Sequence, residues 1–435
     1  IRLSLVGSEM CIRDRFYSVR GALPGRRGVD TNSAIPDNLT GTAGRTGERG
    51  DFMDWTFTDE QEMLRDMVRK FVDNELKPRA EEIDREKRIP RELINQMGEL
   101  GFLGIAFPPE YGGAGMGEMG YCIMQEEIGR GCASTATFIG AHQSIGASGI
   151  YMFGTEEQKQ KYLVPLAEGK KIGAYALTEP NAGSDAFNSE TIAEEKDDHW
   201  LLNGRKIFIT NGSFADIFTV FTKVKGGNAD GKSTAFIVEK DYDGFSIGKI
   251  EEKMGIRGSE TAELILEDVK VPKENVLGRV GRGVLVGMKV LMTGRLGLGA
   301  AALGSAKEAL KLSVEYAKER KQFGKKISQQ QAIQWMLADM ATEIYNMESI
   351  LYRTAWLYDQ GKNVTKESSI VKLYCSEALD RIVDKAMQIY GGYGFICDFP
   401  IERMYRDSRI NRIFEGTNEI QRMILARDVL HDRHL

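Results

Sequence analysis

The amino-acid sequence predicts an α+β multidomain protein with an N-terminal helical domain, a central β-barrel or β-sandwich domain, and a C-terminal four-helix bundle. Three observations predict this architecture. Apolar residues recur at helical spacing from Phe57 to about residue 168. Near Ile172 the pattern changes to short runs of β-branched and aromatic residues separated by turn residues. After about residue 283 the helical spacing returns, in segments long enough to pack as a bundle.

The predicted domains cover residues 53–170, 171–282 and 283–435, and residues 1–52 are expected to be disordered or non-native. This leader is rich in Gly, Arg, Thr and Ser, and it has neither a sustained apolar period nor a starting Met. Its acidic residues argue against an organelle transit peptide. We therefore interpret the leader as non-native and expect the true start at Met53.

Local signals place the elements of the N-terminal domain. Thr58, followed three residues later by a glutamine, predicts a capping box, and Pro78 predicts the end of that first helix. A second helix is predicted after Pro90, a loop over residues 101–120, and further helix over residues 118–168. Glycines inside the loop formally match a dinucleotide fingerprint. Because no apolar strand precedes them, we assign them no nucleotide role.

The central domain is predicted to be all β, because helices do not alternate with its strands. Two Asn-Gly pairs, at residues 203–204 and 211–212, predict turns. The predicted strands span residues 172–178, 188–195, 199–203, 205–210, 216–224, 233–239, 245–250 and 262–271. The predicted helices of the C-terminal bundle span residues 284–318, 327–360, 366–390 and 417–431.

The composition argues against several classes of function. The net charge of −5 argues against nucleic acid as the main partner. No run of 18 apolar residues occurs, so we expect no membrane insertion. The five cysteines are widely spaced and form no CxxC pair, which indicates reduced thiols of a cytosolic or matrix protein. The four histidines form no metal-ligand cluster, so no metal site is predicted.

One carboxylate near the C-terminus is a candidate general base. Glu415 follows Ile413 and Phe414 and precedes Gly416, in a turn before a helix that Thr417 is predicted to cap. The apolar neighbours are expected to desolvate this carboxylate and to raise its pKa toward the range useful for a base. Taken alone, a surface glutamate before a helix is the more common explanation, because structural carboxylates outnumber catalytic ones.

Four motifs in order resemble those of the acyl-CoA dehydrogenase family, in particular its short- and medium-chain, butyryl-CoA dehydrogenase-like members. They are YALTEPNAGSD at residues 175–185, RKQFG at 320–324, QIYGGYGF at 388–395, and FEGT at 414–417. The resemblance extends from about Met53 to Leu430. It makes a catalytic role for the carboxylate in the last motif the better interpretation.

The resemblance implies FAD as the cofactor. The family often has Trp where Phe208 stands, and Phe keeps the stacking surface while losing an N–H donor. Taken singly, Phe208 is more often a core strand residue. The expected FAD contacts are Tyr175, Leu177, Thr178, Phe208, Thr210, Arg320, Gln322, Phe323, Gln331, Gln388, Gly391, Gly392, Thr417 and Glu419.

The resemblance also implies residues that contact the substrate. Ser184 and Arg295 are expected to hold the CoA thioester portion, and Gly416 lies beside the substrate. Many relatives carry Asp three residues before this arginine, whereas this chain has Met292. The usual polar contacts near the CoA arm are therefore in doubt, while the chemistry is not.

The implied reaction is dehydrogenation of a short- or medium-chain acyl-CoA to a trans-2-enoyl-CoA. Glu415 would remove the α-proton while the β-hydride goes to flavin N5. The backbone N–H of Glu415 and a ribityl hydroxyl of FAD would polarise the thioester carbonyl. Electron transfer flavoprotein is the implied acceptor, in the cytoplasm of a bacterium or the mitochondrial matrix of a eukaryote. FAD contacts shared between subunits imply a homotetramer.

Other readings on the same fold stay open. An acyl-CoA oxidase, or a reductase running toward the saturated acyl-CoA, would differ only in how the flavin is reoxidised. A flavin-containing nucleic-acid-binding protein would belong to a different class and would need a basic surface, which the net charge of −5 disfavours.

Overall fold

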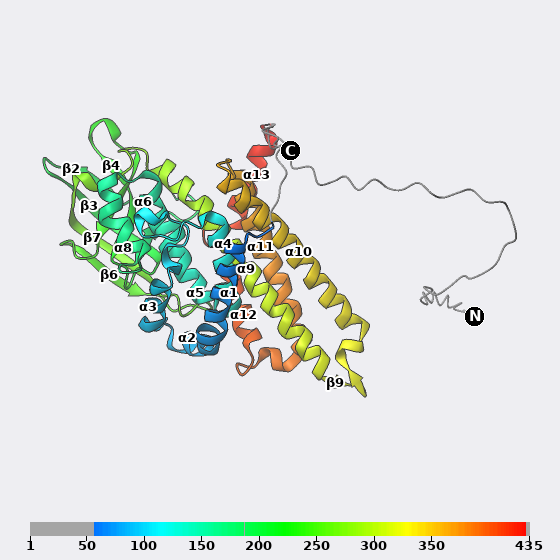
Figure 1. Ribbon diagram of the computed structural model, residues 1–435. Helices are drawn as coiled ribbons and strands as arrows, with labels where there is room; N and C mark the ends of the chain where they lie inside the picture. Colours follow the sequence, from blue (N-terminus) through cyan, green and yellow to red (C-terminus); the bar gives the residue numbers. More distant parts are fainter. Residues whose placement is uncertain (1–55, 187, 432–435) are drawn as a thin grey trace, which may run out of the picture. The chain divides into compact units, whose positions relative to one another are not determined.

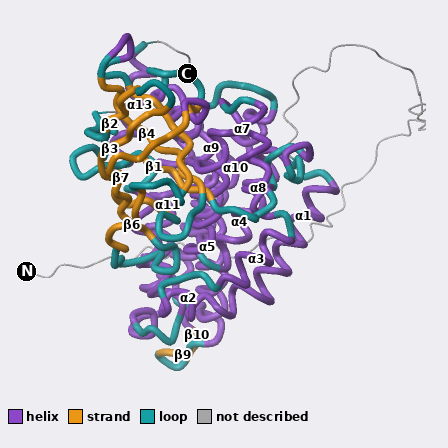
Figure 2. Tube along the Cα trace, turned by 90° about the vertical axis from the view of Figure 1, so that its left-hand side faces the viewer, coloured by secondary structure: helices purple, strands orange, loops and turns teal. Residues whose placement is uncertain are grey.

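The computed structural model describes residues 56–186 and 188–431 of the chain (Figure 1). The predicted leader, residues 1–52, lies outside the described residues. The remaining elements follow the order helices, strands, helices, and Figure 2 shows the strands gathered on one side of the helices. The α–β–α layout predicted from the apolar pattern is therefore present.

The N-terminal helices form where the capping and spacing signals predict them, with one exception. The Thr58 hydroxyl accepts a hydrogen bond from the Gln61 backbone N–H, and the Gln61 side chain accepts one from the Thr58 N–H, so the capping box is confirmed. The predicted stop at Pro78 is wrong. Helical turns continue through this residue because it occupies the first turn of a short 3₁₀ segment, where a missing N–H costs nothing.

The structure gives the following bounds for this domain. The α-helices are α1 Asp59–Phe71, α2 Ala80–Glu86, α3 Arg91–Glu99, α4 Gly117–Gly131, α5 Ala133–Ile139, α6 Ser148–Phe153, α7 Glu156–Gln158 and α8 Val164–Ala167. The π-helical turns are Val72–Leu76, Gly140–Ala147 and Lys159–Leu163, and the 3₁₀ turns are Lys77–Arg79, Phe102–Gly104 and Pro109–Tyr111.

The central domain is built on an eight-stranded sheet in which β1 pairs with β4 outside the main path β6-β7-β3-β2-β4-β5-β8. The strands are β1 Gly173–Ala176, β2 Ile192–Glu195, β3 His199–Thr210, β4 Ile217–Lys225, β5 Ser233–Glu239, β6 Phe245–Ile250, β7 Thr261–Pro272 and β8 Val276–Leu277. The predicted turn at Asn211 is confirmed, and this residue has a φ of 64°.

The predicted turn at residues 203–204 is wrong, because both residues lie inside the continuous strand β3. The register against β7 shifts between Leu202 and Gly204, which marks a β-bulge. The side chain of Asn203 donates to the Asp268 carboxylate (2.9 Å) and accepts from the Asp268 backbone N–H (2.8 Å). The Asn-Gly pair therefore bends a strand here instead of ending one.

The C-terminal part contains three long helices that lie side by side in Figure 1, with a shorter helix, α13, packed on one of them. The helices are α9 Gly283–Glu319, α10 Gln331–Asp359, α11 Thr365–Tyr390, α12 Pro400–Ser408 and α13 Asn418–Leu430. A hairpin of β9 Lys321–Gln322 and β10 Lys325–Lys326 follows α9. The short 3₁₀ segments of this part are Ile327–Gln329, Gly391–Phe395 and Arg409–Arg412.

Helix α9 is the central helix of the fold and packs against both α4 and α11. Small residues let its neighbours approach: a Cβ added at Gly304 would lie 1.8 Å from the carbonyl oxygen of Glu126 on α4. Among the described residues, α9 alone is long and apolar enough to cross a membrane, but 67% of its most apolar window is buried inside the protein.

We predict that Gly304→Ala destabilises the protein by about 2 kcal/mol or more, because the new methyl group meets backbone that cannot move aside. Gly98→Ala on helix α3 is the control, since a Cβ there meets nothing closer than 3.5 Å. Thermal unfolding of both variants checks this. Equal midpoints for the two would show that the α4–α9 approach does not limit stability.

Candidate functional site

The loop before α13 holds Glu415 in a strained backbone conformation. Glu415 has a φ of 56°, a left-handed value that costs a non-glycine residue about 1–3 kcal/mol unless the surroundings enforce it. The buried Gln421 side chain donates to the carbonyl oxygens of Glu415 (3.3 Å) and Gly416 (3.0 Å). The Thr417 hydroxyl accepts from the Ile420 N–H (3.4 Å), so this predicted N-cap is confirmed.

The carboxylate of Glu415 lies against α9. Its Oε2 atom is buried without a hydrogen-bond partner, although the residue as a whole is half-buried. A Cβ added at Gly294 of α9 would come within 2.5 Å of that oxygen. Burial raises the pKa of Glu415 to about 7, and the cations of Arg295 and Lys372 limit the rise. This carboxylate can therefore accept a proton near neutral pH.

Two more buried polar atoms near Glu415 also lack hydrogen-bond partners. They are the hydroxyl of Tyr175 and Nε of Arg295, while an Nη atom of Arg295 donates to the Ser369 hydroxyl (3.2 Å). Burial lowers the pKa of the Arg295 guanidinium, and burial followed by the charge of Glu415 raises the pKa of Tyr175. Unpaired buried polar groups are rare in proteins, and their convergence indicates a site for a polar ligand.

The residues expected to contact the flavin ring come together at the ends of β1 and β3. The Ile207 N–H donates to the Thr178 carbonyl oxygen (2.9 Å), and Lys206 Nζ donates to that of Leu177 (3.2 Å). Phe208 is not a core residue: its side chain is 59% exposed and its φ is 57°. Thr210 ends β3. An exposed aromatic ring near the end of a strand fits the face of a flat cofactor.

A second group of expected FAD contacts meets at the opposite end of the bundle. The Arg320 guanidinium lies 5.4 Å from the ring centroid of Tyr393, and the rings of Tyr316 and Tyr390 stack at 4.1 Å. The end of α9 therefore adjoins the end of α11. The expected contacts here are all exposed: Arg320, Gln322, Phe323, Gln331, Gln388, Gly391 and Gly392. Gly391 adopts a φ of 59° and a ψ of −136°, which favours glycine.

The structure does not bring these two groups together within one chain. Arg295 and Arg320 lie 25 residues apart along α9 and its end, which corresponds to about 37 Å of helix. Thr417 and Glu419, expected near the adenine, lie in the first turn of α13 beside Glu415. Ser184 is exposed in the loop after β1.

Several residues of the Glu415 cluster have no signal in the sequence motifs. Lys372 and Ser369 lie on α11, Tyr121 lies on α4, and Asn418 and Gln421 lie on α13. All five are buried. A single lysine on a helix face otherwise made of small and apolar residues is the one sequence feature that could have indicated Lys372.

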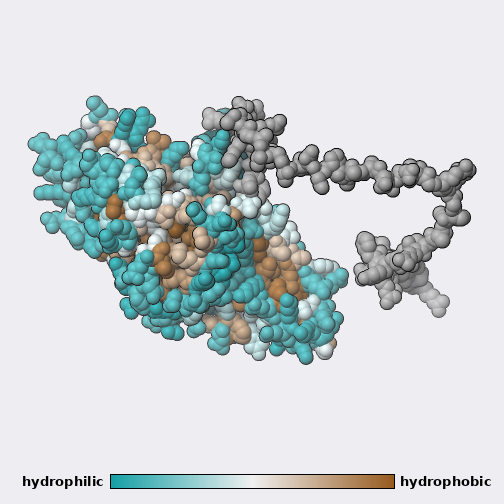
Figure 3. All heavy atoms as spheres, in the orientation of Figure 1, coloured by the Kyte–Doolittle hydropathy of each residue, from teal (hydrophilic) through white to brown (hydrophobic). Residues whose placement is uncertain are grey.

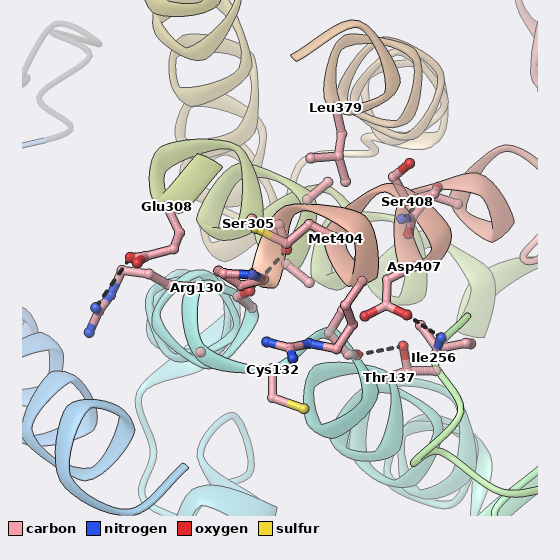
Figure 4. Close-up of a pocket in the computed structure, with 18 of the residues that line it drawn as sticks. Arg130, Cys132, Thr137, Ile256, Ser305, Glu308, Leu379, Met404, Asp407 and Ser408 are labelled. Atoms are coloured by element: carbon pink, nitrogen blue, oxygen red, sulfur yellow. Dashed lines mark hydrogen bonds and ion pairs between the residues drawn. The ribbon is translucent and has the colours of Figure 1, made fainter. Parts of the chain in front are cut away.

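A cavity of about 190 Å³ lies elsewhere, between α4, α5, α9 and α12 (Figure 4). Cys132, Glu308 and Asp407 line it, but none of the expected site residues does. We place the candidate site at Glu415, and not at this cavity, because buried polar atoms without hydrogen-bond partners come together there. Within residues 56–186 and 188–431, no three His, Cys, Asp or Glu side chains are grouped to hold a metal ion.

Comparisons with known proteins show the family to which this chain belongs. Three family models match, described as the acyl-CoA dehydrogenase N-terminal domain (residues 58–170), middle domain (174–269) and C-terminal domain (281–430). A short-chain-specific acyl-CoA dehydrogenase of Clostridium acetobutylicum is 47% identical over 86% of this chain and 99% of its own length. An acryloyl-CoA reductase (NADH) of Anaerotignum propionicum is 46% identical over 88% and 98%.

One solved structure is similar over the same range. It is described as the electron transferring flavoprotein of Acidaminococcus fermentans, and it contains a chain 46% identical to this one. The match covers 87% of this chain and 100% of that chain, with a TM-score of 0.85.

We predict that Glu415→Gln stabilises the substrate-free protein increasingly as pH rises from about 4.5 to about 7. A carboxyl whose folded pKa is raised binds more protons in the folded than in the unfolded state, so the native protein loses stability over this window. The gain in the free energy of unfolding should level off above pH 7, and its size should be on the order of 2–3 kcal/mol. Unfolding measured between pH 5 and 8 checks this, with Glu110→Gln at an exposed position as control. Parallel curves for native and Glu415→Gln would contradict a buried, pKa-raised carboxyl.

Proposed function

Because the chain belongs to the acyl-CoA dehydrogenase family, whose members are FAD-dependent oxidoreductases acting on CH–CH donors, we propose that it dehydrogenates a short- or medium-chain acyl-CoA to the trans-2-enoyl-CoA. The family, the fold and FAD as cofactor agree with the sequence prediction. The observation that carries the proposed reaction is the buried, unpaired Oε2 atom of Glu415.

Glu415 is the proposed base for the α-proton. Its pKa near 7 keeps a substantial ionised fraction at neutral pH and leaves it basic enough to take a proton. Among the described residues no acceptor takes its backbone N–H, so this donor is free to bind a developing enolate oxygen. A donor aimed at such an oxyanion contributes on the order of 3 kcal/mol to rate enhancement.

The residues present fit FAD. The exposed ring of Phe208 and the adjoining strand ends at Thr178 and Thr210 would hold the isoalloxazine, and Arg320 carries a planar cation suited to a pyrophosphate. FAD, when bound, supplies the acceptor for the β-hydride. This chain's part is to position the thioester between that acceptor and Glu415 and to take up the α-proton.

We propose a homotetramer in which FAD contacts come from two subunits. About 37 Å of helix separates Arg320 from Arg295, which lies beside Glu415, and this distance supports contact of Arg320 with a cofactor bound at a neighbouring subunit. Large apolar side chains at the surface of the bundle also support association: Trp335 is 61% exposed and Tyr345 is 71% exposed on α10. Figure 3 shows apolar side chains at the surface of the helical part.

The proposed electron acceptor is an electron transfer flavoprotein. The structure of the Acidaminococcus fermentans electron transferring flavoprotein, which contains a similar chain, supports this partner. We propose that the protein acts in the cytoplasm if its source is bacterial and in the mitochondrial matrix if its source is eukaryotic, without membrane insertion.

A second candidate is the reverse reaction, reduction of a short enoyl-CoA. The 46% identity to an acryloyl-CoA reductase favours keeping it. Both directions use the same proton and hydride positions, so the Glu415 geometry does not separate them. The two directions are separated by measuring flavin reduction by acyl-CoA and flavin oxidation by enoyl-CoA, each with and without electron transfer flavoprotein. Oxygen uptake without that partner would indicate an oxidase.

Tyr121 supports a substrate at the short end of the range. A Cβ added at Gly297 would lie 2.4 Å from the Tyr121 hydroxyl. Gly297 is about one helical turn along α9 from Gly294, the residue that the Glu415 carboxylate approaches. Residues three apart share one helix face, so both side chains lie against the same face of α9. An acyl tail directed along α9 from Glu415 would meet this ring within a few carbons.

We predict that Glu415→Gln retains yellow FAD and binds acyl-CoA, but that its flavin is bleached about 10²–10⁴-fold more slowly under anaerobic conditions, because no base takes the α-proton. Stopped-flow absorbance checks this. Glu110→Gln should bleach at the native rate. Near-native bleaching of Glu415→Gln would reject Glu415 as the base.

We predict that Tyr121→Ala raises kcat/KM for octanoyl-CoA relative to butyryl-CoA by at least about tenfold, since each added methylene that is buried gains about 0.8 kcal/mol. Tyr121→Phe keeps the ring and should keep the native preference. An unchanged ranking of chain lengths in Tyr121→Ala would show that another residue limits the acyl chain.

A further inference from the structure

A buried lysine lies beside the proposed base without belonging to any of the motifs. Lys372 on α11 is fully buried, and its Nζ donates to the Asn418 side-chain oxygen at 2.6 Å. Asn418 is the first residue of α13 and is buried. Its side chain is also held by Ser376, and its amide nitrogen donates to Glu377 (3.3 Å). These hydrogen bonds, which we call the strap, hold the start of α13 against α11, three residues beyond Glu415.

The charged groups around Lys372 and Glu415 come from several elements. Glu415 faces Arg295 from α9 and Lys372 from α11, together with the hydroxyls of Tyr121 from α4 and Tyr175 from β1. Lys372 in turn faces Glu415 and Arg295, together with Glu377 on its own helix and Glu419 on α13. Two buried cations thus lie near one carboxylate whose Oε2 atom is buried.

A purely structural role does not explain this lysine. An ammonium buried between helices costs several kcal/mol unless hydrogen bonds and opposite charges compensate it, and a methionine would fill similar volume without that cost. Burial lowers the pKa of Lys372 to about 8, which shows that the desolvation is only partly offset. The charge that offsets this desolvation most is that of Glu415.

We propose that Lys372 is a positioning residue for the reaction: its ammonium keeps Glu415 ionised in the absence of water, and its hydrogen bond to Asn418 keeps the Glu415 loop against α9. This inference rests on the proposed role of Glu415 as base. The two contributions can be separated, because Lys372→Met and Lys372→Gln remove the charge, whereas Asn418→Ala removes the strap and leaves the charge.

The test is the pH dependence of anaerobic flavin bleaching by butyryl-CoA in the FAD-loaded full chain, from pH 6 to 9. The acid limb is the pH range in which the bleaching rate falls as Glu415 becomes protonated. Lys372→Met and Lys372→Gln should shift this limb upward by about one pH unit, because Glu415 loses a cation that favours its charged form. Bleaching at pH 6.5 should then be about tenfold slower and should approach the native rate at pH 9. Asn418→Ala should be slower at every pH with the native acid limb.

Lys385→Met is the matched control. Lys385 lies on the same helix, about 20 Å from Lys372, and pairs with Asp339 at 3.8 Å near the surface. Its acid limb should be native. A native acid limb in either Lys372 variant overturns the proposal. Failure of both variants to fold, with Asn418→Ala intact, assigns Lys372 a structural role and also overturns it.

A second measurement needs no acyl-CoA. In a double-mutant cycle of Lys372→Met and Glu415→Gln, thermal unfolding of the FAD-loaded protein at about pH 7.5, where both side chains are mostly charged, should show a smaller loss from Lys372→Met when Glu415 is already replaced. Additive effects overturn the pairing. If the native flavin is not bleached by any acyl-CoA, the proposed function fails, and the cycle still reports whether Lys372 and Glu415 interact.

Discussion

The proposed reaction depends on holding one carboxylate oxygen where neither water nor a hydrogen-bond donor of the chain reaches it. Oε2 of Glu415 meets this condition because its backbone is held at a left-handed φ by the carbonyl contacts of Gln421. A strained residue of this kind persists only where its surroundings over-determine it. The surrounding helices supply that constraint, and the same burial sets the pKa of the carboxyl near neutrality.

Helix α9 is the element against which the site is assembled. Its glycines allow close contacts that a larger residue would prevent. Backbone of α4 approaches Gly304, the Tyr121 hydroxyl approaches Gly297, and the Glu415 carboxylate approaches Gly294. Arg295, next along the helix, brings a buried cation to the same point. The small and apolar residues that make α9 the one described helix long and apolar enough to cross a membrane thus also allow the close contacts at the site.

Much of this could be predicted from the sequence, because the signals were local. The helical and β periods, the capping residue Thr417 and the turn at Glu415 each depend on neighbours a few positions away. What could not be predicted depends on contacts between distant segments. The bond from Lys372 to Asn418 joins residues 46 positions apart, and the Asn-Gly pair at 203–204 bends a strand only because Asp268 pairs with it across the sheet.

The most direct test of the central claim separates proton removal from redox chemistry. Methoxyacetyl-CoA matches butyryl-CoA in shape, but its β-position is an oxygen with no hydrogen to transfer. In deuterated water the FAD-loaded native protein should exchange the α-hydrogens of this compound, at a rate that falls as pH drops below about 7. Glu415→Gln should not exchange them. Equal exchange by the two proteins would contradict the account, because the α-proton would then have another acceptor.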